Sequence, residues 1–153
     1  MDAVMLFATS ASWSLLIVRL FLGVIFFAHG AQKVFGWFGG PGLKNTINFF
    51  RGSLGIPPAL AVLAAFTECF GGLAVFLGLL TRLAALGLVV TMLVAIATVH
   101  GKNGFFLNMS LQPGKGHGIE FNLALLGMAL ALLVGGGGAA SVDRLILAWL
   151  TGA

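Results

Sequence analysis

Three ionisable side chains interrupt the first long apolar stretch of the sequence. Arg19, His29 and Lys33 lie between residues 12 and 35, among leucine, isoleucine, valine, phenylalanine and glycine. Ionisable groups in a stretch apolar enough to enter a bilayer are costly unless they face a protein interior or a polar cavity. Such groups can also transfer protons and hold polar ligands. The sequence therefore predicts partners for them elsewhere in the chain.

Glu68 is the favoured partner because it lies in the middle of a second apolar run, at about residues 57–80. Helices rise about 1.5 Å per residue, and counting from the ends of the two runs places Glu68 at a depth between Arg19 and His29. We expect Arg19 and Glu68 to form an intramembrane ion pair that fixes helix register, with His29 and Arg82 as competing partners. A carboxylate at this depth is paired or protonated, since desolvation disfavours its charged form.

Four further polar residues are expected to meet at one end of the apolar runs. If consecutive spans alternate in direction, the ends of the first and third lie beside the starts of the second and fourth, which gathers His29, Lys33, His100 and Glu120. Histidine and lysine can hydrogen-bond carbonyl oxygens, and phenylalanines can form the walls of a pocket. This combination favours a flat, partly polar, lipid-soluble ligand. Two weaker alternatives are a haem held by His29 and His100 and a histidine–glutamate metal site. No metal ligands are assigned.

The composition is that of an integral membrane protein. Of 153 residues, 59% are hydrophobic and 8% are charged, whereas soluble domains carry about 25% charged residues. Mean hydropathy is +1.10. The net charge of +4 bears on membrane orientation and not on nucleic acid, because the chain has no basic cluster suited to a duplex. Cys69 is the single cysteine, which excludes a disulfide or a dithiol relay within the chain.

The apolar runs predict an all-α fold, an integral membrane four-helix bundle with antiparallel spans in a single membrane domain, residues 1–153. The expected spans are about residues 12–35, 57–80, 83–100 and 119–138. A helix needs about 20 residues to cross a bilayer, so the last two spans are short. Glycine-rich loops lie on one side of the bundle. A short C-terminal interfacial helix, residues 142–150, is capped by Ser141 and carries Asp143 in its first turn.

The distribution of basic residues predicts the orientation of a multi-pass protein of the cell inner (plasma) membrane. Positively charged residues near span ends favour the cytoplasmic side. The loop side carries Lys33, Lys44, Arg51, Lys102 and Lys115, and the opposite side carries Arg82 and Arg144. We therefore expect both loops in the cytoplasm and both termini outside.

Short motifs along nearly the whole chain resemble the DoxX family of small four-helix membrane proteins. They are RLFLG at 19–23, HGAQK at 29–33, GWFGGPG at 36–42, ECFGG at 68–72, GLLTRLA at 78–84, His100, GIEF at 118–121 and SVD at 141–143. Family members often have Gly-Pro-Gly-Arg before the last motif, and this chain has Gly-Gly-Gly-Gly-Ala-Ala at 135–140. The resemblance implies a bacterial membrane protein with a redox or quinone connection, since some relatives are subunits of thiosulfate:quinone oxidoreductases.

Three functions fit these observations. The first is a quinone-linked redox protein, or a membrane subunit of an oxidoreductase, with quinone favoured over haem as its ligand. The second is a non-catalytic scaffold in the lipid bilayer for a soluble redox partner. The third is a small-solute permease, which would need a homo-oligomer because four short helices leave little room for a channel. No activated nucleophile and no flavin or nicotinamide motif is evident, so catalytic residues are not assigned and independent enzymatic activity stays open.

Overall fold

The computed structural model describes residues 3–152, and these residues contain helices and no strands. The all-helical prediction is therefore confirmed for this part of the chain. In chain order, the helical elements are α1 (Ala3–Phe7), α2 (Trp13–Phe35), the 3-10 helix η1 (Trp37–Gly39), α3 (Gly42–Leu54), α4 (Pro58–Phe66), the π-helix η2 (Thr67–Gly71), α5 (Gly72–Leu77), α6 (Thr81–Ala95), the π-helix η3 (Ile96–His100), the 3-10 helix η4 (Gly101–Asn103), α7 (Glu120–Gly135) and α8 (Val142–Thr151).

Three continuous helical stretches of the described chain are long and apolar enough to cross a membrane. They are Trp13–Phe35, Pro58–Leu77 and Thr81–Asn103, and a shorter apolar helix spans Glu120–Gly135. In lipid, backbone polar groups must be satisfied within the protein, which is why apolar runs of this length fold as helices. The protein is thus a membrane protein with several apolar helices.

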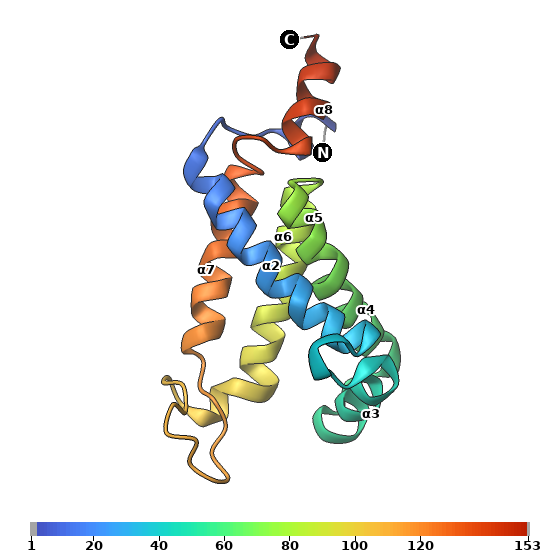
Figure 1. The fold of residues 1–153 in the computed structure, drawn as a ribbon, viewed down its shortest axis with the longest axis vertical. Coiled ribbons are helices and arrows are strands. Elements are labelled where there is room, and N and C mark those ends of the chain that lie inside the picture. The colour runs from blue at the N-terminus through green and yellow to red at the C-terminus, as the bar shows by residue number, and fades with distance from the viewer. Residues whose placement is uncertain (1–2, 153) are drawn as a thin grey trace.

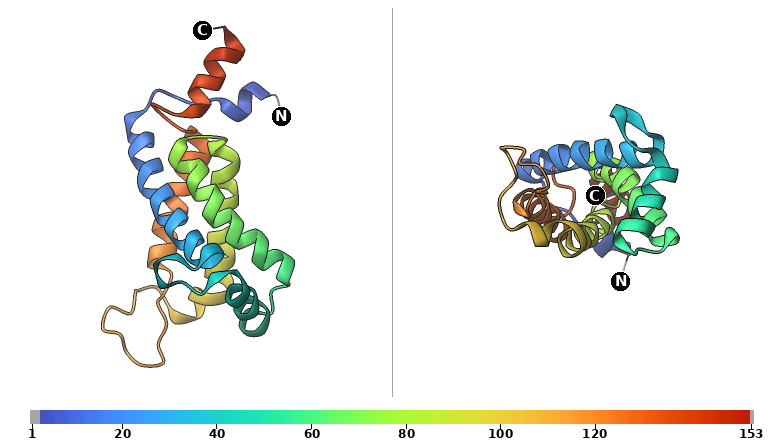
Figure 2. Two further views of the ribbon diagram at one scale, coloured as in Figure 1. Left: turned by 45° about the vertical axis from the view of Figure 1, so that its right-hand side comes forward. Right: turned by 90° about the horizontal axis from the view of Figure 1, so that it is seen from below.

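The two ends of the molecule differ in what they carry. Helix α3 and residues 104–119 lie at one end, which we call the loop end, whereas α1 and α8 lie together at the other, which we call the terminal end (Figure 1). The same division is visible after rotation about the vertical axis (Figure 2). The sequence expectation that both glycine-rich loops share one side therefore agrees with the arrangement of the helices.

Helix α2 has clear start and stop signals. The Ser12 side chain accepts a hydrogen bond from the Leu15 backbone N–H at 3.3 Å, which satisfies a donor that would otherwise lack a partner in the first turn. At the other end Gly36 adopts a left-handed conformation with φ 73°, which glycine reaches without a steric penalty. The chain then turns toward α3, whose Thr46 hydroxyl donates to the Lys33 carbonyl at 3.3 Å.

Glycines set the register between α2 and the segment formed by η2 and α5. At three positions an added Cβ would lie within 2.7 Å of facing backbone atoms, and the facing pairs are Gly23 with Phe76, Gly72 with Phe27, and Gly30 with Cys69. Small residues allow membrane helices to approach this closely, and close packing is the main attraction between helices in lipid. The two helices therefore cannot slide along each other without a backbone clash.

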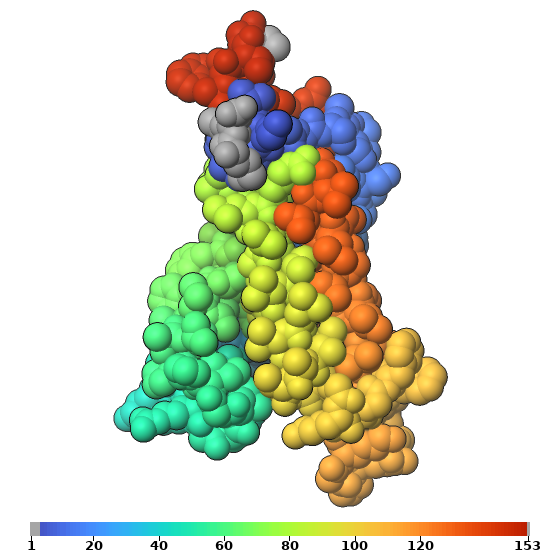
Figure 3. All heavy atoms as spheres, turned by 180° about the vertical axis from the view of Figure 1, so that it is seen from behind, coloured from blue at the N-terminus to red at the C-terminus, as the bar shows by residue number. Residues whose placement is uncertain are grey.

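The centre of the molecule is apolar and closely packed. Leu22, Phe26, Val75, Leu88 and Leu132 are each at most 2% exposed and belong to one hydrophobic cluster. Helices α6 and α7 lie side by side on the back face (Figure 3) and share an extensive contact. This core separates the polar groups of the terminal end from those of the loop end.

The turn between the second and third apolar helices differs from the sequence prediction. Those spans were expected at about 57–80 and 83–100, but α5 ends at Leu77 and α6 begins at Thr81. Gly78 and Leu80 form the turn with φ values of 69° and 48°. The Asp143 carboxylate accepts hydrogen bonds from the N–H groups of Leu80 at 2.6 Å and Thr81 at 2.9 Å. A residue 62 positions away thus caps α6 and lets it begin earlier.

The C-terminal helix lies where the sequence places it. Helix α8 covers Val142–Thr151, against an expected 142–150, and the Ser141 hydroxyl accepts from the Arg144 N–H at 3.3 Å. Asp143 lies in its first turn, as expected, although its carboxylate is directed to α6. The preceding helix α7 ends at Gly135, three residues short of the expected 138, because Gly136 has φ 77° and leaves the helical conformation.

Candidate functional site

A cavity of about 400 Å³ lies near the loop end, between α2, η2, the segment α6–η3, α7 and the loop of residues 104–119. We call it the loop-end pocket. Its polar lining consists of His29, Lys33, Glu68, His100, His117 and Asn122, and its remaining lining consists of Phe26, Met92, Ala95, Leu107, Gly118, Phe121 and Leu125. An apolar wall with a few convergent polar groups is the usual character of a small-molecule site.

Three of the four residues predicted to meet at this end line the pocket. These are His29, Lys33 and His100, which come from α2 and η3. The structure therefore brings them together, and their role in binding a ligand stays a prediction. The fourth residue, Glu120, does not line the pocket.

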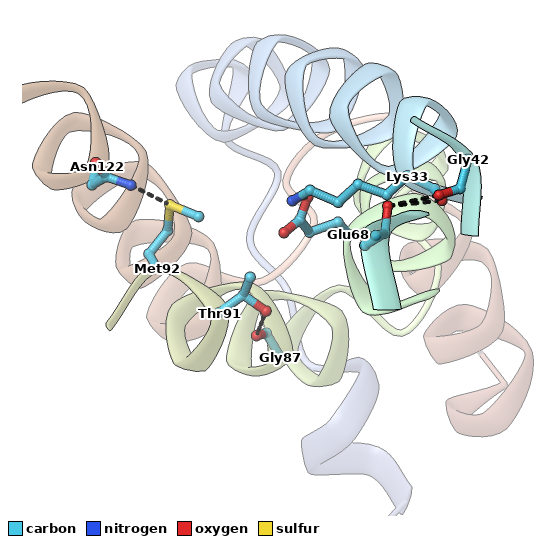
Figure 4. Close-up of polar contacts among 8 residues, drawn as sticks. Lys33, Gly42, Glu68, Gly87, Thr91, Met92 and Asn122 are labelled. Atoms are coloured by element: carbon cyan, nitrogen blue, oxygen red, sulfur yellow. Dashed lines mark hydrogen bonds and ion pairs between the residues drawn. The ribbon is translucent and has the colours of Figure 1, made fainter. Parts of the chain in front are cut away.

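Glu120 is engaged with the loop instead. Its carboxylate accepts from the Leu107 N–H at 3.1 Å and its own N–H donates to the Phe105 carbonyl at 2.9 Å. As the first residue of α7, Glu120 lies about 200° around the helix from Asn122. Asn122 is 6% exposed, and its amide donates to the Met92 sulfur at 3.6 Å (Figure 4). The acidic residue that does line the pocket is Glu68.

Two pocket residues lie on π-helical turns. Glu68 belongs to η2 and His100 belongs to η3, the only π-helices among residues 3–152. A π-turn inserts an extra residue into a helix, redirects the side chains on that turn, and occurs frequently at functional sites. The apolar runs predict regular helices at both positions and give no sign of either π-turn.

The carboxylate of Glu68 pairs with Lys33. The Lys33 ammonium and Glu68 Oε2 form the only salt bridge between described residues, and the two side chains point toward each other between their helices (Figure 4). The Glu68 side chain is 5% exposed and the Lys33 side chain is 27% exposed. Lys33 therefore retains access to the pocket while it neutralises a buried acid.

The predicted Arg19–Glu68 ion pair is wrong. Arg19 is 2% exposed, and its terminal nitrogens donate to the carbonyls of Phe76 at 3.0 Å, Ala139 at 3.3 Å and Ala140 at 3.0 Å. Gly30 faces Cys69, next to Glu68, and lies eleven positions beyond Arg19. At about 1.5 Å per residue, roughly 16 Å of helix α2 separates Arg19 from the level of Glu68.

Arg82 also lacks an acidic partner in the described chain. Its Nε donates to the Ala8 carbonyl at 3.0 Å and Nη1 donates to the Leu133 carbonyl at 2.8 Å. The arginines thus fasten the chain segments of the terminal end by carbonyl hydrogen bonds. The acid buried at this end is Asp143, 1% exposed, for which the sequence predicts only a position in the first turn of the last helix. Its position two residues after the helix-capping Ser141 gives no signal for a long-range cap.

The loop contributes His117, which is not among the residues that the sequence predicts for the site. Its carbonyl is 3.0 Å from His100 Nδ1 and accepts from the Asn103 amide at 3.0 Å. Its own Nδ1 is 3.2 Å from the Asn108 N–H. Both histidine rings are therefore oriented by backbone groups of the same loop.

A metal centre does not fit this arrangement. Among residues 3–152, no three histidine, cysteine, aspartate or glutamate side chains lie close enough to hold a metal ion. The pocket contains instead one ion pair, three imidazole rings and one carboxamide. This set of groups can donate and accept hydrogen bonds and can hold protons.

Comparison with known protein families fixes the relationship of the chain. The model of the DoxX family matches residues 14–101. The chain belongs to the DoxX family. The matched region includes four residues that line the pocket of this DoxX protein, namely His29, Lys33, Glu68 and His100.

Two curated relatives extend the comparison. This DoxX protein is 40% identical over 93 residues to a Bacillus subtilis protein named "Putative oxidoreductase CatD", and the alignment covers 61% of the chain and 64%, less than two thirds, of CatD. It is 35% identical over 136 residues to the uncharacterized membrane protein Rv3486 of Mycobacterium tuberculosis, covering 86% of the chain and 80% of that protein. No solved structure matches the chain.

Proposed function

We propose that this DoxX protein is a multi-pass protein of the inner membrane whose loop-end pocket binds a lipid-soluble ring compound of the quinone class, in a redox role. The observation that carries the proposal is the pocket itself. It joins Lys33, Glu68 and the histidines to an apolar wall that includes Phe26 and Leu125. A volume of about 400 Å³ lies within the range of about 300–1,000 Å³ typical of small-molecule sites.

The chemistry of a quinone fits both parts of the lining. Its flat ring and apolar tail partition into lipid, and aromatic side chains such as Phe26 and Phe121 pack well against a ring. Its two oxygens need hydrogen-bond donors, which the Lys33 ammonium and histidine ring N–H groups can supply. Both π-turns direct side chains to this pocket, which supports a functional role for the location.

The proposed architecture is four antiparallel membrane spans with the loop end in the cytoplasm. The contacts of α2 with α5 and α7, and of α6 with α7, support the bundle. Exposed basic residues at the loop end, Lys44, Arg51, Lys102 and Lys115, support the orientation, because cytoplasmic loops carry an excess of positive charge.

The name of CatD points to a redox role for that relative, and we extend it to this chain as part of the proposal. The protein would bind the quinone itself, alone or as the membrane subunit of an oxidoreductase. The scaffold hypothesis rests on the same exposed lysines and arginine of the loop end, which offer a charged surface to a soluble redox partner. The permease hypothesis is disfavoured, because buried residues such as Leu22 and Leu88 fill the centre between the two polar ends.

Titration of the purified protein with a short-chain quinone tests the proposal. In lipid nanodiscs, calorimetry should detect saturable binding, and Lys33→Met should weaken it by about 10- to 150-fold, the equivalent of a charge-assisted hydrogen bond of about 1.5–3 kcal/mol. Lys44→Met is the matched control, since Lys44 is exposed on α3 outside the pocket. The absence of saturable binding, or equal losses in both variants, would contradict the proposal. Recovery of a soluble dehydrogenase by a ligand-free protein would instead favour the scaffold.

A further inference from the structure

Hydrogen bonds within the loop of residues 104–119 hold its two arms together. Its two arms pair where Gly118 N–H donates to the Phe106 carbonyl at 3.1 Å and Ile119 N–H to the Gly104 carbonyl at 3.1 Å. Further along the loop Asn108 is 7% exposed, and its amide donates to the Lys115 carbonyl at 2.7 Å. The backbone groups that meet the two histidines of the pocket are therefore fixed in place.

These backbone groups determine where the proton of the neutral His100 ring lies. Nδ1 of His100 is 3.0 Å from the His117 carbonyl oxygen. A carbonyl oxygen only accepts hydrogen bonds, so Nδ1 must carry the proton. In the neutral ring Nε2 is then unprotonated and presents a lone pair. His100 lines the pocket, and the ring nitrogen left for a ligand is this acceptor.

His117 is held in the opposite form. Its Nδ1 is 3.2 Å from the backbone nitrogen of Asn108, which can only donate. Nδ1 must therefore be the acceptor and the proton of the neutral ring lies on Nε2. His117 also lines the pocket. One histidine thus offers an acceptor and the other a donor, although the two side chains are of the same type.

We propose that the pocket selects the hydroxyl-bearing, reduced form of its ring ligand over the dione, with His100 Nε2 accepting a phenolic hydroxyl and His117 Nε2–H donating to a ligand oxygen. This inference rests on the proposed function and adds the substrate class, a hydroquinone or related phenol. A dione has no hydrogen to donate, so it would leave the His100 acceptor without a partner in the pocket, and an unpaired polar group is costly.

The other ionisable groups of the pocket are compatible with this selection. His29 and Lys33 face it from α2 and Glu68 faces it from η2. The Lys33 ammonium has three N–H donors, which suit the oxygen of either ligand form. Glu68, like His100, can accept from a hydroxyl and gains nothing from a dione. Selection between the two forms therefore depends on the acceptors.

The first test reads the protonated nitrogens directly. In full-length protein with ¹⁵N-labelled histidine in nanodiscs, at a pH where the rings are neutral, nitrogen chemical shifts distinguish the two neutral forms. The chain has three histidines, which single glutamine substitutions assign. We expect His100 to be protonated on Nδ1 and His117 on Nε2. Protonation of His100 on Nε2, or of His117 on Nδ1, would overturn the inference.

The second test measures selectivity with matched probes. Under anaerobic conditions trimethylhydroquinone should bind at least about tenfold more tightly than trimethylbenzoquinone, the equivalent of one hydrogen bond. His100→Phe should weaken trimethylhydroquinone binding by about tenfold and so remove most of the preference, because the acceptor of the phenolic hydroxyl is lost. His100→Gln keeps a side-chain acceptor and should retain part of the preference, which covers the case that the phenylalanine variant does not fold. Equal affinity for both probes in the unmodified protein overturns this inference alone, whereas no binding of either probe overturns the proposed function with it.

Discussion

Replacement of Gly30 by alanine should separate α2 from η2 and disturb the loop-end pocket. The added Cβ would lie 2.1 Å from Cys69 N and 2.3 Å from Cys69 Cα. Carbon contacts are comfortable at about 3.5–4.0 Å, so the helices must move apart by more than about 1 Å. The atoms in the way belong to the backbone, and no side-chain rotation can relieve the clash.

The expected cost follows from the behaviour of overpacked cores. Inserting a methyl group into a well-packed site costs about 1–3 kcal/mol, and a backbone clash belongs at the upper limit. For a chain of this size about 1 kcal/mol shifts Tm by about 2–4 °C, so Gly30→Ala should lower Tm by about 6–12 °C. Gly127→Ala is the matched control, because Gly127 lies within α7 with no foreign atom within 4 Å of an added Cβ. Its Tm should stay equal or rise slightly, since alanine favours a helix.

The protein carries its own reporter for this experiment. Cys69 is the single cysteine and its side chain is 0% exposed, so a thiol-reactive fluorogenic maleimide reports unfolding as the temperature rises. Circular dichroism provides a second melting curve that does not depend on the thiol. A Gly30→Ala variant whose Tm lies within about 2 °C of both the parent and Gly127→Ala would refute the close approach of Gly30 to Cys69 and the register derived from it.

Other substitutions test the two polar ends with the same Cys69 assay. Asp143→Ala should cost about 2–4 kcal/mol because it leaves the buried Thr81 N–H and the partly buried Leu80 N–H without their acceptors. Asp143→Asn keeps one acceptor oxygen and should cost less. Equal losses would argue against the capping role. Lys33→Met should lower the free energy of unfolding by about 1–3 kcal/mol, because it leaves the Glu68 carboxylate unpaired. Adding Glu68→Met to this variant should recover most of the loss. Additive losses would show that the two groups do not interact. Arg82→Lys should lose about 1 kcal/mol, because an ammonium cannot reproduce the two separated guanidinium contacts, and an unchanged Tm would count against them.

The helical class and part of the pocket were predictable because they depend on local chemistry. Lipid requires a helix wherever an apolar run is long enough to span it. The approximate positions of the helices therefore follow from the positions of the apolar runs in the sequence. Runs that alternate in direction bring His29, Lys33 and His100 to one end, whatever the details of their packing. The same reasoning failed for Glu120, whose contact with the Leu107 N–H depends on how the loop folds back.

The ion-pair prediction failed because depth along a helix is not fixed by the ends of apolar runs. Helix α2 begins at Trp13, six residues before Arg19, while α5 ends at Leu77, close to Arg19 itself. Helix α2 therefore extends beyond its neighbour, and Glu68 lies nearer the loop end than counting from run ends suggests. The register was encoded in glycines such as Gly30, but a single sequence does not show which backbone each glycine faces.

His117 was missed because its position depends on a loop without periodicity. The flanking glycines carried a usable signal: a Cβ at Gly118 would lie 2.4 Å from the Gly104 carbonyl oxygen and a Cβ at Gly116 would lie 2.5 Å from the Asn103 amide. Glycine is required at position 118, where two backbones approach this closely, whereas Gly116 faces the end of a side chain. His117 therefore lies next to a glycine that the folding of the loop requires, which makes it a candidate for a fixed ring.

The difference between Arg19 and Lys33 explains why only one end of α2 is suited to a ligand. Arg19 directs its terminal nitrogens to three carbonyls and is 2% exposed, so a ligand would have to displace structural hydrogen bonds to reach it. Lys33 has one side-chain partner among the described residues, Glu68, and its side chain remains 27% exposed. An ammonium has three donors, so Lys33 can bind a ligand oxygen while it still neutralises Glu68. The register that separates Arg19 from Glu68 thus leaves a cation with unused hydrogen-bonding capacity in the pocket.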